Sequence, residues 1–253
     1  MKTFTKMLLI DFKRTQLRNF AALFFSLLMP IAFYLLFTKV MNQDVPAKYL
    51  ISFQKQYMIS MVTYSIVISM LFSFASLLAR DNLIGIPKWL RITSLPNRYY
   101  YLSKLTNVIL QNLLSIMLVY LVAATVNHVH FSGQEFALML IWLLLASLPL
   151  SLIGIMISMI NNENTRSVFS NLLTFPLVIV SGLWWPLDQM PKFMQHIGYL
   201  SPVYAVNAAG QALANGEVFQ WSWLWTILIW FVILLIVLMC LNKLRNRLSQ
   251  SVS

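Results

Sequence analysis

The hydrophobic pattern of the chain is a series of long apolar stretches separated by short polar ones. Six stretches reach the roughly 17–25 residues that an α-helix needs to cross the apolar core of a bilayer. These expected spans are residues 20–40, 57–78, 102–126, 136–160, 168–184 and 223–241. The pattern therefore predicts an all-α polytopic membrane protein with six transmembrane helices, forming one transmembrane domain over residues 1–253.

The segment before the first span, residues 1–19, combines apolar and basic side chains. Its apolar members are Phe4, Met7, Leu8 and Phe12, and its basic members are Lys2, Lys6, Lys13, Arg14 and Arg18. A helix of this kind lies on a membrane surface with its cations toward the lipid headgroups. We expect an interfacial amphipathic helix here, and an ordinary basic flank is the alternative.

Residues 185–220 are apolar but too broken for a spanning helix. Around and within them stand Gly182, Pro186, Pro191, Gly198, Pro202, Gly210 and Gly216. Proline removes a backbone donor and glycine weakens a helix, so this many breakers exclude one continuous helix. We expect one or two short re-entrant helices in the outer leaflet, where Trp184, Trp185, Phe193, Tyr199 and Tyr204 would suit the aromatic belt.

Composition and charge support the membrane-protein class and restrict the kinds of partner that we expect. The chain is 59% apolar and 10% charged, whereas a soluble domain is about half apolar and a quarter charged. With both termini cytoplasmic, all but four of the 18 lysines and arginines lie on the inner side, the four being Lys39, Lys48, Lys55 and Lys192. Cytoplasmic loops of membrane proteins are basic. The net charge of +11 therefore indicates a lipid bilayer as partner and not nucleic acid.

Candidate metal chemistry is sparse. The single cysteine, Cys240, lies in an apolar run, so the sequence offers no intrachain disulfide and no cysteine-based metal site. His128, His130 and Glu135 share one outer turn, where a metal site is conceivable. The two histidines are too close in sequence to share a helix face, so an ordinary polar turn is the better interpretation and no metal is expected.

A serine stripe marks the second expected span. Ser65, Ser69 and Ser73 recur every fourth residue and would share one helix face. Small hydroxyl residues at this spacing let helices approach closely and bond across the contact. The stripe could be a packing contact within one subunit, and a dimer seam or substrate wall is the alternative.

The chemistry that is missing restricts the function. The sequence contains no G-x-x-x-x-G-K-[ST], no H-E-x-x-H, no G-x-S-x-G and no paired intramembrane carboxylates. No span is expected to hold a buried charge, because the acids, Asp81 among them, are placed in loops or interfacial segments. Ion-coupled carriers usually carry such a charge. We therefore expect no catalytic residues in this chain and an energy supply from a cytosolic partner.

The basic segment 80–100, with the residues that follow it, would meet that partner. It reads RDNLIGIPKWLRITSLPNRYYYLSK through Lys104 and mixes cations with apolar residues as a short amphipathic helix would. It resembles a pattern of the permease family of type-2 ABC exporters at Arg80, Asp81, Gly85, Leu95, Pro96, Tyr101 and Lys104. The outer segment is similar to the same family's re-entrant region at Gly182, Pro186, Met190, Pro191, Ile197, Pro202 and Tyr204. Asp81 and Ile86 depart from the pattern, which often has Glu and Thr there.

The resemblance implies a function and a set of site residues. The chain would be half of a transmembrane pore in a bacterial cytoplasmic membrane, paired with a second permease, either another copy or a similar chain. Two copies of a separately encoded ATPase would bind ATP and Mg²⁺, so this chain itself needs no cofactor. The implied ATPase-coupling residues are Arg80, Asp81, Gly85, Trp89, Leu90 and Arg91; the secondary cytosolic contacts are Asp11, Arg14, Glu163 and Arg166; the outer gate residues are Gly182, Pro186, Pro191, Pro202 and Tyr204.

The expected activity is export of an amphipathic or lipid-like substrate, such as an antibiotic, a peptide or a lipid-linked compound. The apolar interior with hydroxyl and aromatic side chains favours such a cargo, whereas the outward direction follows from the resemblance. Two alternatives stay open. One is an ATP-independent carrier or channel, and the other is a non-transporting sensor or immunity protein that sequesters a peptide at the membrane.

Overall fold

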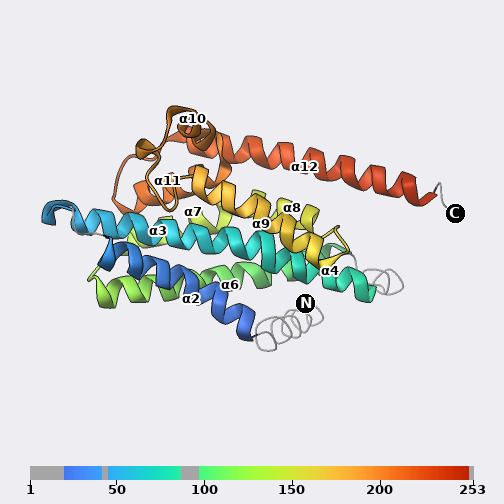
Figure 1. Cartoon of the computed structure of the whole chain (residues 1–253), viewed down its shortest axis with the longest axis horizontal. Coiled ribbons are helices and arrows are strands. Elements are labelled where there is room, and N and C mark those ends of the chain that lie inside the picture. Colours follow the sequence, from blue (N-terminus) through green and yellow to red (C-terminus); the bar gives the residue numbers. More distant parts are fainter. Residues whose placement is uncertain (1–19, 42–44, 87–96, 251–253) are drawn as a thin grey trace.

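The protein is built from helices throughout the described part of the chain. The computed structural model describes residues 20–41, 45–86 and 97–250, and these ranges contain no strand. The longer helices run roughly along the long axis of the molecule (Figure 1). The elements are α2 (Phe20–Leu35), η2 (Leu36–Val40), η3 (Ala47–Tyr49), α3 (Leu50–Ile68), η4 (Ser69–Phe74), α4 (Ala75–Ile84), α6 (Asn97–Val126), α7 (Gly133–Ala146), α8 (Leu148–Ile157), α9 (Glu163–Val180), η5 (Leu187–Gln189), α10 (Lys192–Leu200), α11 (Pro202–Ala214) and α12 (Trp221–Gln250).

Four helical segments among the described residues are long and apolar enough to cross a membrane. They are Ala47–Ile84, Tyr99–Val126, Gly133–Ile157 and Trp221–Leu244. A shorter apolar helix covers Leu27–Val40. These segments confirm an all-helical membrane protein, and each of the four overlaps a stretch that the hydrophobic pattern marks as a span.

The long segment Ala47–Ile84 forms the centre of the molecule. Of its most apolar 18 residues 72% are buried, compared with 11% for Trp221–Leu244. Met58, Ile66 and Met70 are among its fully buried side chains. The helices α2, α6, α8, α9 and α11 all contact this central segment. The described part of the chain therefore leaves most of the apolar surface of α12 uncovered, while the central helix has mostly protein neighbours.

A wider turn interrupts the central helix. Residues Ser69–Phe74 form the π-helical turn η4 between α3 and α4. Such a turn inserts an extra residue and disturbs the regular backbone hydrogen bonds. The hydroxyl of Ser170 on α9 donates a hydrogen bond of 2.9 Å to the backbone oxygen of Leu71 in this turn. A side chain from a neighbouring helix thus satisfies a backbone group at membrane depth, as the bilayer interior requires.

The turn η4 also lies very close to α8. A Cβ atom added at Gly154 would collide with the backbone oxygen of Met70 and would crowd the ring of Phe74. Only glycine permits this approach. The short break at Ser147, followed by Pro149 in the first turn of α8, separates α8 from α7 and sets its course.

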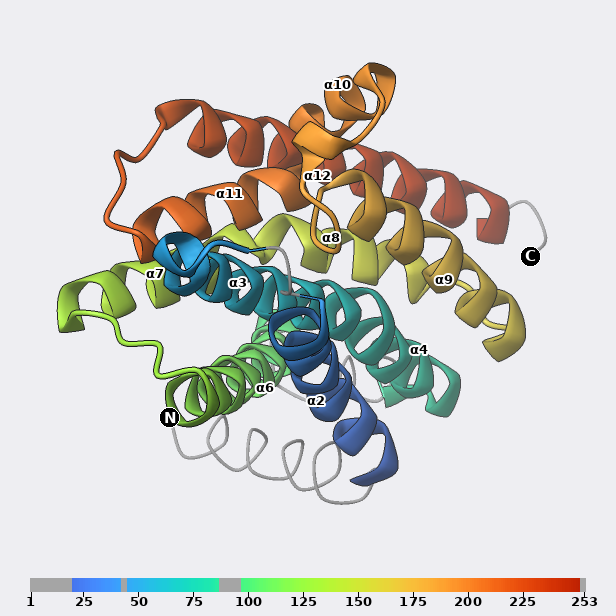
Figure 2. The same ribbon diagram turned by 60° about the vertical axis from the view of Figure 1, so that its left-hand side comes forward.

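The two ends of the molecule differ in construction. The C-terminal ends of α4 and α12 and the N-terminal ends of α2 and α9 lie toward one end, which we call the basic end (Figures 1 and 2). The helices α10 and α11 and the N-terminal parts of α7 and α12 lie toward the opposite end, which we call the hairpin end. The breakers in residues 185–220 thus produce two short helices at one end, in place of another spanning helix.

Candidate functional site

The central helix ends at Gly85, inside the basic segment. Gly85 adopts the left-handed conformation (φ 82°), and its backbone N–H bonds to the oxygens of Asn82 and Asp81. Glycine takes this conformation at little steric cost and commonly ends helices. The helix therefore continues through Arg80 and Asp81, which the sequence assigned to a loop.

Asp81 forms a buried ion pair with Lys104. Its Oδ2 lies 2.7 Å from the Lys104 Nζ, and the two side chains are 0% and 2% exposed. The Tyr100 hydroxyl donates to the same oxygen at 3.0 Å, and the Lys104 ammonium lies 5.3 Å from the Tyr100 ring centroid. The expectation that no charge is buried in the helices is wrong here, because each charge is compensated by the other.

This ion pair joins the two helices, α4 and α6, on either side of the expected ATPase-coupling residues; we call residues 80–100 the coupling segment after that expected role. Asp81 belongs to α4 and Lys104 to α6, so the pair and Tyr100 hold the ends of these helices together. Arg80, Leu83 and Ile84 point outward from the same turns, and Leu83 and Ile84 are 62% and 53% exposed. The described part of the coupling segment thus has an inward charged contact and an outward surface that is apolar beside Arg80.

Several expected contact residues fall outside the described ranges. Trp89, Leu90 and Arg91 of the coupling segment are among them, as are Asp11 and Arg14 of the N-terminal segment. Their roles stay predictions.

The other two expected cytosolic contacts lie at the start of α9. Asn162 caps this helix by accepting a hydrogen bond from the Thr165 N–H at 3.0 Å. Glu163 is exposed at the basic end, but Arg166 is only 5% exposed and donates to the Ile160 oxygen at 3.1 Å. Glu163 is therefore available to a partner, whereas the Arg166 side chain is occupied within the fold.

A stripe of polar residues follows the buried face of α6. Its members are Ser103, Asn107, Gln111, Asn112 and Ser115, each no more than 7% exposed. The Ser65 and Ser115 hydroxyls bond each other at 2.6 Å, and the Ser69 hydroxyl donates to Asn112. Two serines of the expected stripe thus make contacts within the chain, between the central helix and α6.

The third serine leaves this contact. Ser73 is half-buried, and it comes after the start of the π-helical turn η4. Because that turn contains more residues than an α-helical turn, it breaks the four-residue register that the sequence pattern assumed. The sequence pattern alone does not predict such a π-helical turn.

At the hairpin end, Gly182 and the three expected prolines stand at element boundaries, whereas Gly198 and Gly210 lie inside α10 and α11. Gly182 is left-handed (φ 72°) after α9, and Pro186 precedes η5. Pro191 precedes α10, and Pro202 is the first residue of α11. The Ser181 and Ser201 hydroxyls bond each other at 2.7 Å, so the end of α9 is tied to the start of α11.

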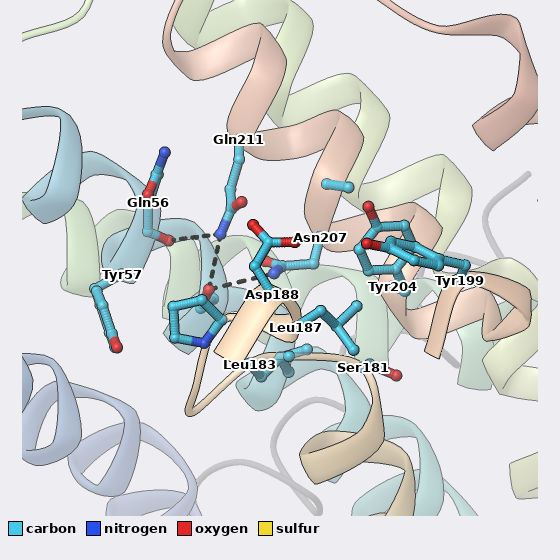
Figure 3. A pocket seen from close by; sticks show the side chains of 14 residues that line it. Gln56, Tyr57, Ser181, Leu183, Leu187, Asp188, Tyr199, Tyr204, Asn207 and Gln211 are labelled. Atoms are coloured by element: carbon cyan, nitrogen blue, oxygen red, sulfur yellow. Dashed lines mark hydrogen bonds between the residues drawn. The ribbon is translucent and has the colours of Figure 1, made fainter. Parts of the chain in front are cut away.

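These elements and α3 surround an open cavity of about 220 Å³ (Figure 3), which we call the outer cavity because the sequence predicts that this end faces outward. Its polar lining includes Gln56, Ser60, Asp188, Tyr199, Tyr204, Asn207 and Gln211. Of the expected gate residues, Gly182, Pro186 and Tyr204 line it, whereas Pro191 and Pro202 do not.

Burial is the main cause that raises the pKa of Tyr204 above its usual value, with smaller contributions from Tyr199 and Asp188. The Tyr204 hydroxyl is therefore protonated and able to donate a hydrogen bond at neutral pH.

The outer turn with the two histidines has a structural explanation. Ser132 accepts a hydrogen bond from the Glu135 N–H, and the Glu135 carboxylate accepts one from the Ser132 N–H at 2.9 Å. This reciprocal arrangement is a capping box that starts α7. The Glu135 carboxylate, which is the only one close to His128 and His130 in the sequence, thus stabilises a helix terminus.

Sequence reasoning missed two features of the site. The first is the Asp81–Lys104 pair, and the second is the convergence of Gln56, Asp188 and Gln211 on the outer cavity. A signal for the first was present, since Lys104, Asn107 and Gln111 recur along the start of an otherwise apolar span. The second had no local signal, because the three residues come from distant parts of the chain.

The fold defines a helical membrane protein. A family model described as ABC-2 type transporter matches residues 1–213, and the chain belongs to this family. The resemblance indicated by the two sequence motifs is therefore confirmed.

Two relatives from Bacillus subtilis (strain 168) carry permease names. The protein named transport permease YvfS is 29% identical over 252 residues, which cover 100% of both chains. The linearmycin resistance permease protein LnrN is 36% identical over 66 residues, which cover 25% of this chain and 17% of that protein. The full-length match extends the similarity beyond the family model to the last helix.

Proposed function

We propose that this protein is the membrane-spanning permease subunit of an ATP-driven exporter in a bacterial cytoplasmic membrane. The observation that carries the proposal is the family match over residues 1–213, joined by the end-to-end similarity to a protein named as a transport permease. In this proposal α2 and α9 also span the bilayer, which gives six spans with both termini in the cytosol. In Figure 1 α2 and α12 run in opposite directions along the long axis, so the α2 start and the α12 end both point toward the basic end, which supports this arrangement.

In this proposal the energy of ATP hydrolysis reaches the permease through the end of α4 and the residues that follow it. Residues 80–92 fit a groove in a separately encoded ATPase, and two such ATPase subunits bind ATP and Mg²⁺. The exposed apolar side chains of Leu83 and Ile84 beside Arg80 support a protein contact at this end. The Asp81–Lys104 pair supports transmission, because it couples α4 to α6 so that both helices follow a force on the segment between them.

Transport requires a second permease across the pathway, which is another copy or a similar chain. ATP binds better to the closed arrangement of the ATPase subunits and so shifts the population of permease conformations. The central helix and α9 would then change their separation from the partner permease. The hairpin end acts as the outer gate, and its short helices, Gly182 and Pro186 support a segment that can be displaced without unfolding a span.

The cargo is an amphipathic or lipid-like molecule, such as an antibiotic, a peptide or a lipid-linked compound. The resistance permease among the relatives supports an antibiotic, although that match covers 66 residues. The hydroxyl and amide side chains inside an apolar helical protein support a molecule with both apolar and polar parts.

A pull-down of the tagged protein in mild detergent tests this function. We expect a stoichiometric companion with a phosphate-binding loop and vanadate-sensitive ATP hydrolysis in the eluate. A Leu83→Asp variant should lose the companion, because a carboxylate replaces an exposed apolar contact at the basic end. Val218→Asp is the matched control, since Val218 is 88% exposed at the hairpin end.

Two outcomes would count against the proposal. A permease that purifies without a nucleotide-binding companion in several detergents would favour an ATP-independent carrier or a peptide-sequestering protein. Equal loss of the companion in Leu83→Asp and Val218→Asp would show that the companion does not bind specifically at the basic end.

A further inference from the structure

The outer cavity has polar walls that are fixed before any ligand enters. The Ser60 hydroxyl on α3 accepts hydrogen bonds from the Asn207 amide at 3.3 Å and the Gln211 amide at 3.0 Å. Gln211 also donates to the Gln56 backbone oxygen at 3.3 Å, and the Thr63 hydroxyl donates to the Asn207 side-chain oxygen at 3.4 Å. Figure 3 shows the bonds that Asn207 and Gln211 donate to Ser60 and to the Gln56 backbone oxygen, and these bonds join α11 to α3. The amides are therefore oriented, which lowers the entropy cost of binding a polar ligand.

One charge faces this network. Asp188 is the only acidic or basic residue on the cavity wall. No ion-pair partner for its carboxylate exists within the described residues, and Gln195 contacts only its backbone oxygen. A carboxylate that has no ion-pair partner among the described residues makes this part of the cavity wall locally negative.

Two tyrosines complete the lining. The rings of Tyr199 and Tyr204 meet edge to face, with centroids 5.1 Å apart and an interplanar angle of 80°. Tyrosine rings attract cations through their faces, and their hydroxyls both donate and accept hydrogen bonds. The cavity thus combines a carboxylate, aromatic rings and fixed amides.

The outer cavity is larger than a site for a single water. A single water needs roughly 10–15 Å³ of such space. The outer cavity offers about 220 Å³ and is open, so a small organic group can enter it.

We propose that the outer cavity is a binding site for an organic ammonium group that also carries hydroxyl or amide groups. Asp188 neutralises the ammonium, the tyrosine rings and hydroxyls surround it, and Gln211 and Asn207 meet the neighbouring polar groups. The ammonium comes either from a molecule that the protein moves or from the headgroup of an ethanolamine lipid. Binding itself does not depend on the proposed ATP-driven export, because it concerns the permease alone.

The test is ligand-observed NMR on the purified full-length protein in nanodiscs of phosphatidylglycerol, which contain no amine. The probe is N-methylglucamine, and sorbitol is the neutral counterpart with a hydroxyl in place of the amine. We expect saturation transfer and a measurable Kd for N-methylglucamine and at least fivefold weaker binding of sorbitol. Equal binding of the two, or binding of neither, overturns the proposal without any variant.

Variants locate the binding. Asp188→Asn keeps the shape of the side chain and should weaken N-methylglucamine binding about fivefold, as expected for one exposed charge pair. Glu217→Gln removes a carboxylate from the same end outside the cavity and should leave the Kd unchanged. Tyr199→Leu should weaken binding more than Tyr199→Phe if the ring face carries the cation contact. An unchanged Kd for Asp188→Asn, in protein that elutes like the wild type from a sizing column, overturns the assignment.

Nanodisc composition distinguishes the two sources. If the headgroup of phosphatidylethanolamine is the natural occupant, discs that contain this lipid should raise the apparent Kd of N-methylglucamine. If the Kd is the same in both kinds of disc, the site serves a separate amine, and both results support an ammonium site.

Discussion

At the residue scale, the Asp81–Lys104 pair buries a carboxylate that the sequence pattern placed in a loop. Removing both charges from water is costly, and the pair is tolerated because the two groups lie 2.7 Å apart and Tyr100 adds a hydrogen bond. Breaking the pair by removing one partner therefore costs more free energy than the intact pair contributes to stability.

We predict that Asp81→Asn destabilises the protein by roughly 3–5 kcal/mol, because the buried Lys104 ammonium then loses the carboxylate that lies 2.7 Å from it. The double variant Asp81→Asn with Lys104→Met should recover part of this loss. The apparent melting temperature in detergent, followed by size-exclusion chromatography, measures both.

Arg80→Gln serves as the control for that series. Arg80 is the exposed neighbour of Asp81, so its replacement should change stability by no more than about 0.5 kcal/mol. If Asp81→Asn melts at the wild-type temperature, the ion pair does not hold α4 to α6. A loss of transport in an Asp81 variant must also be separated from this loss of stability.

Ser69 and Ser73 give a second matched pair. Ser69 is 2% exposed and bonds Asn112, so Ser69→Leu should both overfill the contact and remove a hydrogen bond, at a cost of about 2–4 kcal/mol. Ser73→Leu changes a half-buried position after the start of the π-helical turn and should cost much less. Equal melting temperatures for the two variants would contradict the assignment of Ser69 to the α3–α6 contact.

At the element scale, the end of the central helix is decided by Gly85 and not by the first charged residue. Arginine and aspartate are acceptable within helices, so hydropathy drops at Arg80 while the backbone hydrogen bonds continue to Ile84. The distinction matters for function, because a helix delivers Leu83 and Ile84 to the surface on one rigid element.

The contact of α8 with η4 also acts at this scale. We predict that Gly154→Ala destabilises the protein by roughly 1–3 kcal/mol, because its Cβ would collide with the Met70 backbone oxygen, which cannot move aside as a side chain can. Gly133→Ala is the control, since a Cβ at Gly133 meets nothing within 4 Å. Thermal unfolding in detergent compares the two, and a Gly154→Ala protein as stable as Gly133→Ala would show that the two elements can separate freely.

At the scale of the whole molecule, the positions of the two ends predict which side of the membrane each exposed residue faces. Gln189 is exposed at the hairpin end, and Glu163 is exposed at the basic end. The free Cys240 is also exposed and is removed first by Cys240→Ser.

In that background we predict that Gln189→Cys reacts with an impermeant thiol reagent added to intact cells, whereas Glu163→Cys reacts only after the cells are opened. The reason is that basic segments stay in the cytosol and the hairpin end lies opposite them. Gel-shift labelling measures both. Reaction of Glu163→Cys in intact cells would reverse the orientation.

The sequence by itself determined the helical membrane class, the six apolar stretches, the breaker-rich outer segment and, through two motifs, the family. These features depend on local composition and on the order of motifs, because the length of an apolar run and the position of a proline act on the backbone where they occur. Four of the stretches are membrane-capable helices among the described residues.

Only the tertiary structure decided the partners of the polar side chains. Asp81 in α4 meets Lys104 in α6, Ser65 and Ser69 face α6 within one chain, and Gln56, Asp188 and Gln211 surround one cavity. Hydropathy treats each of these residues as an interruption of an apolar run. Whether such a residue is solvated, paired or aimed into a cavity depends on which helix packs against it, and that is a property of the assembled bundle.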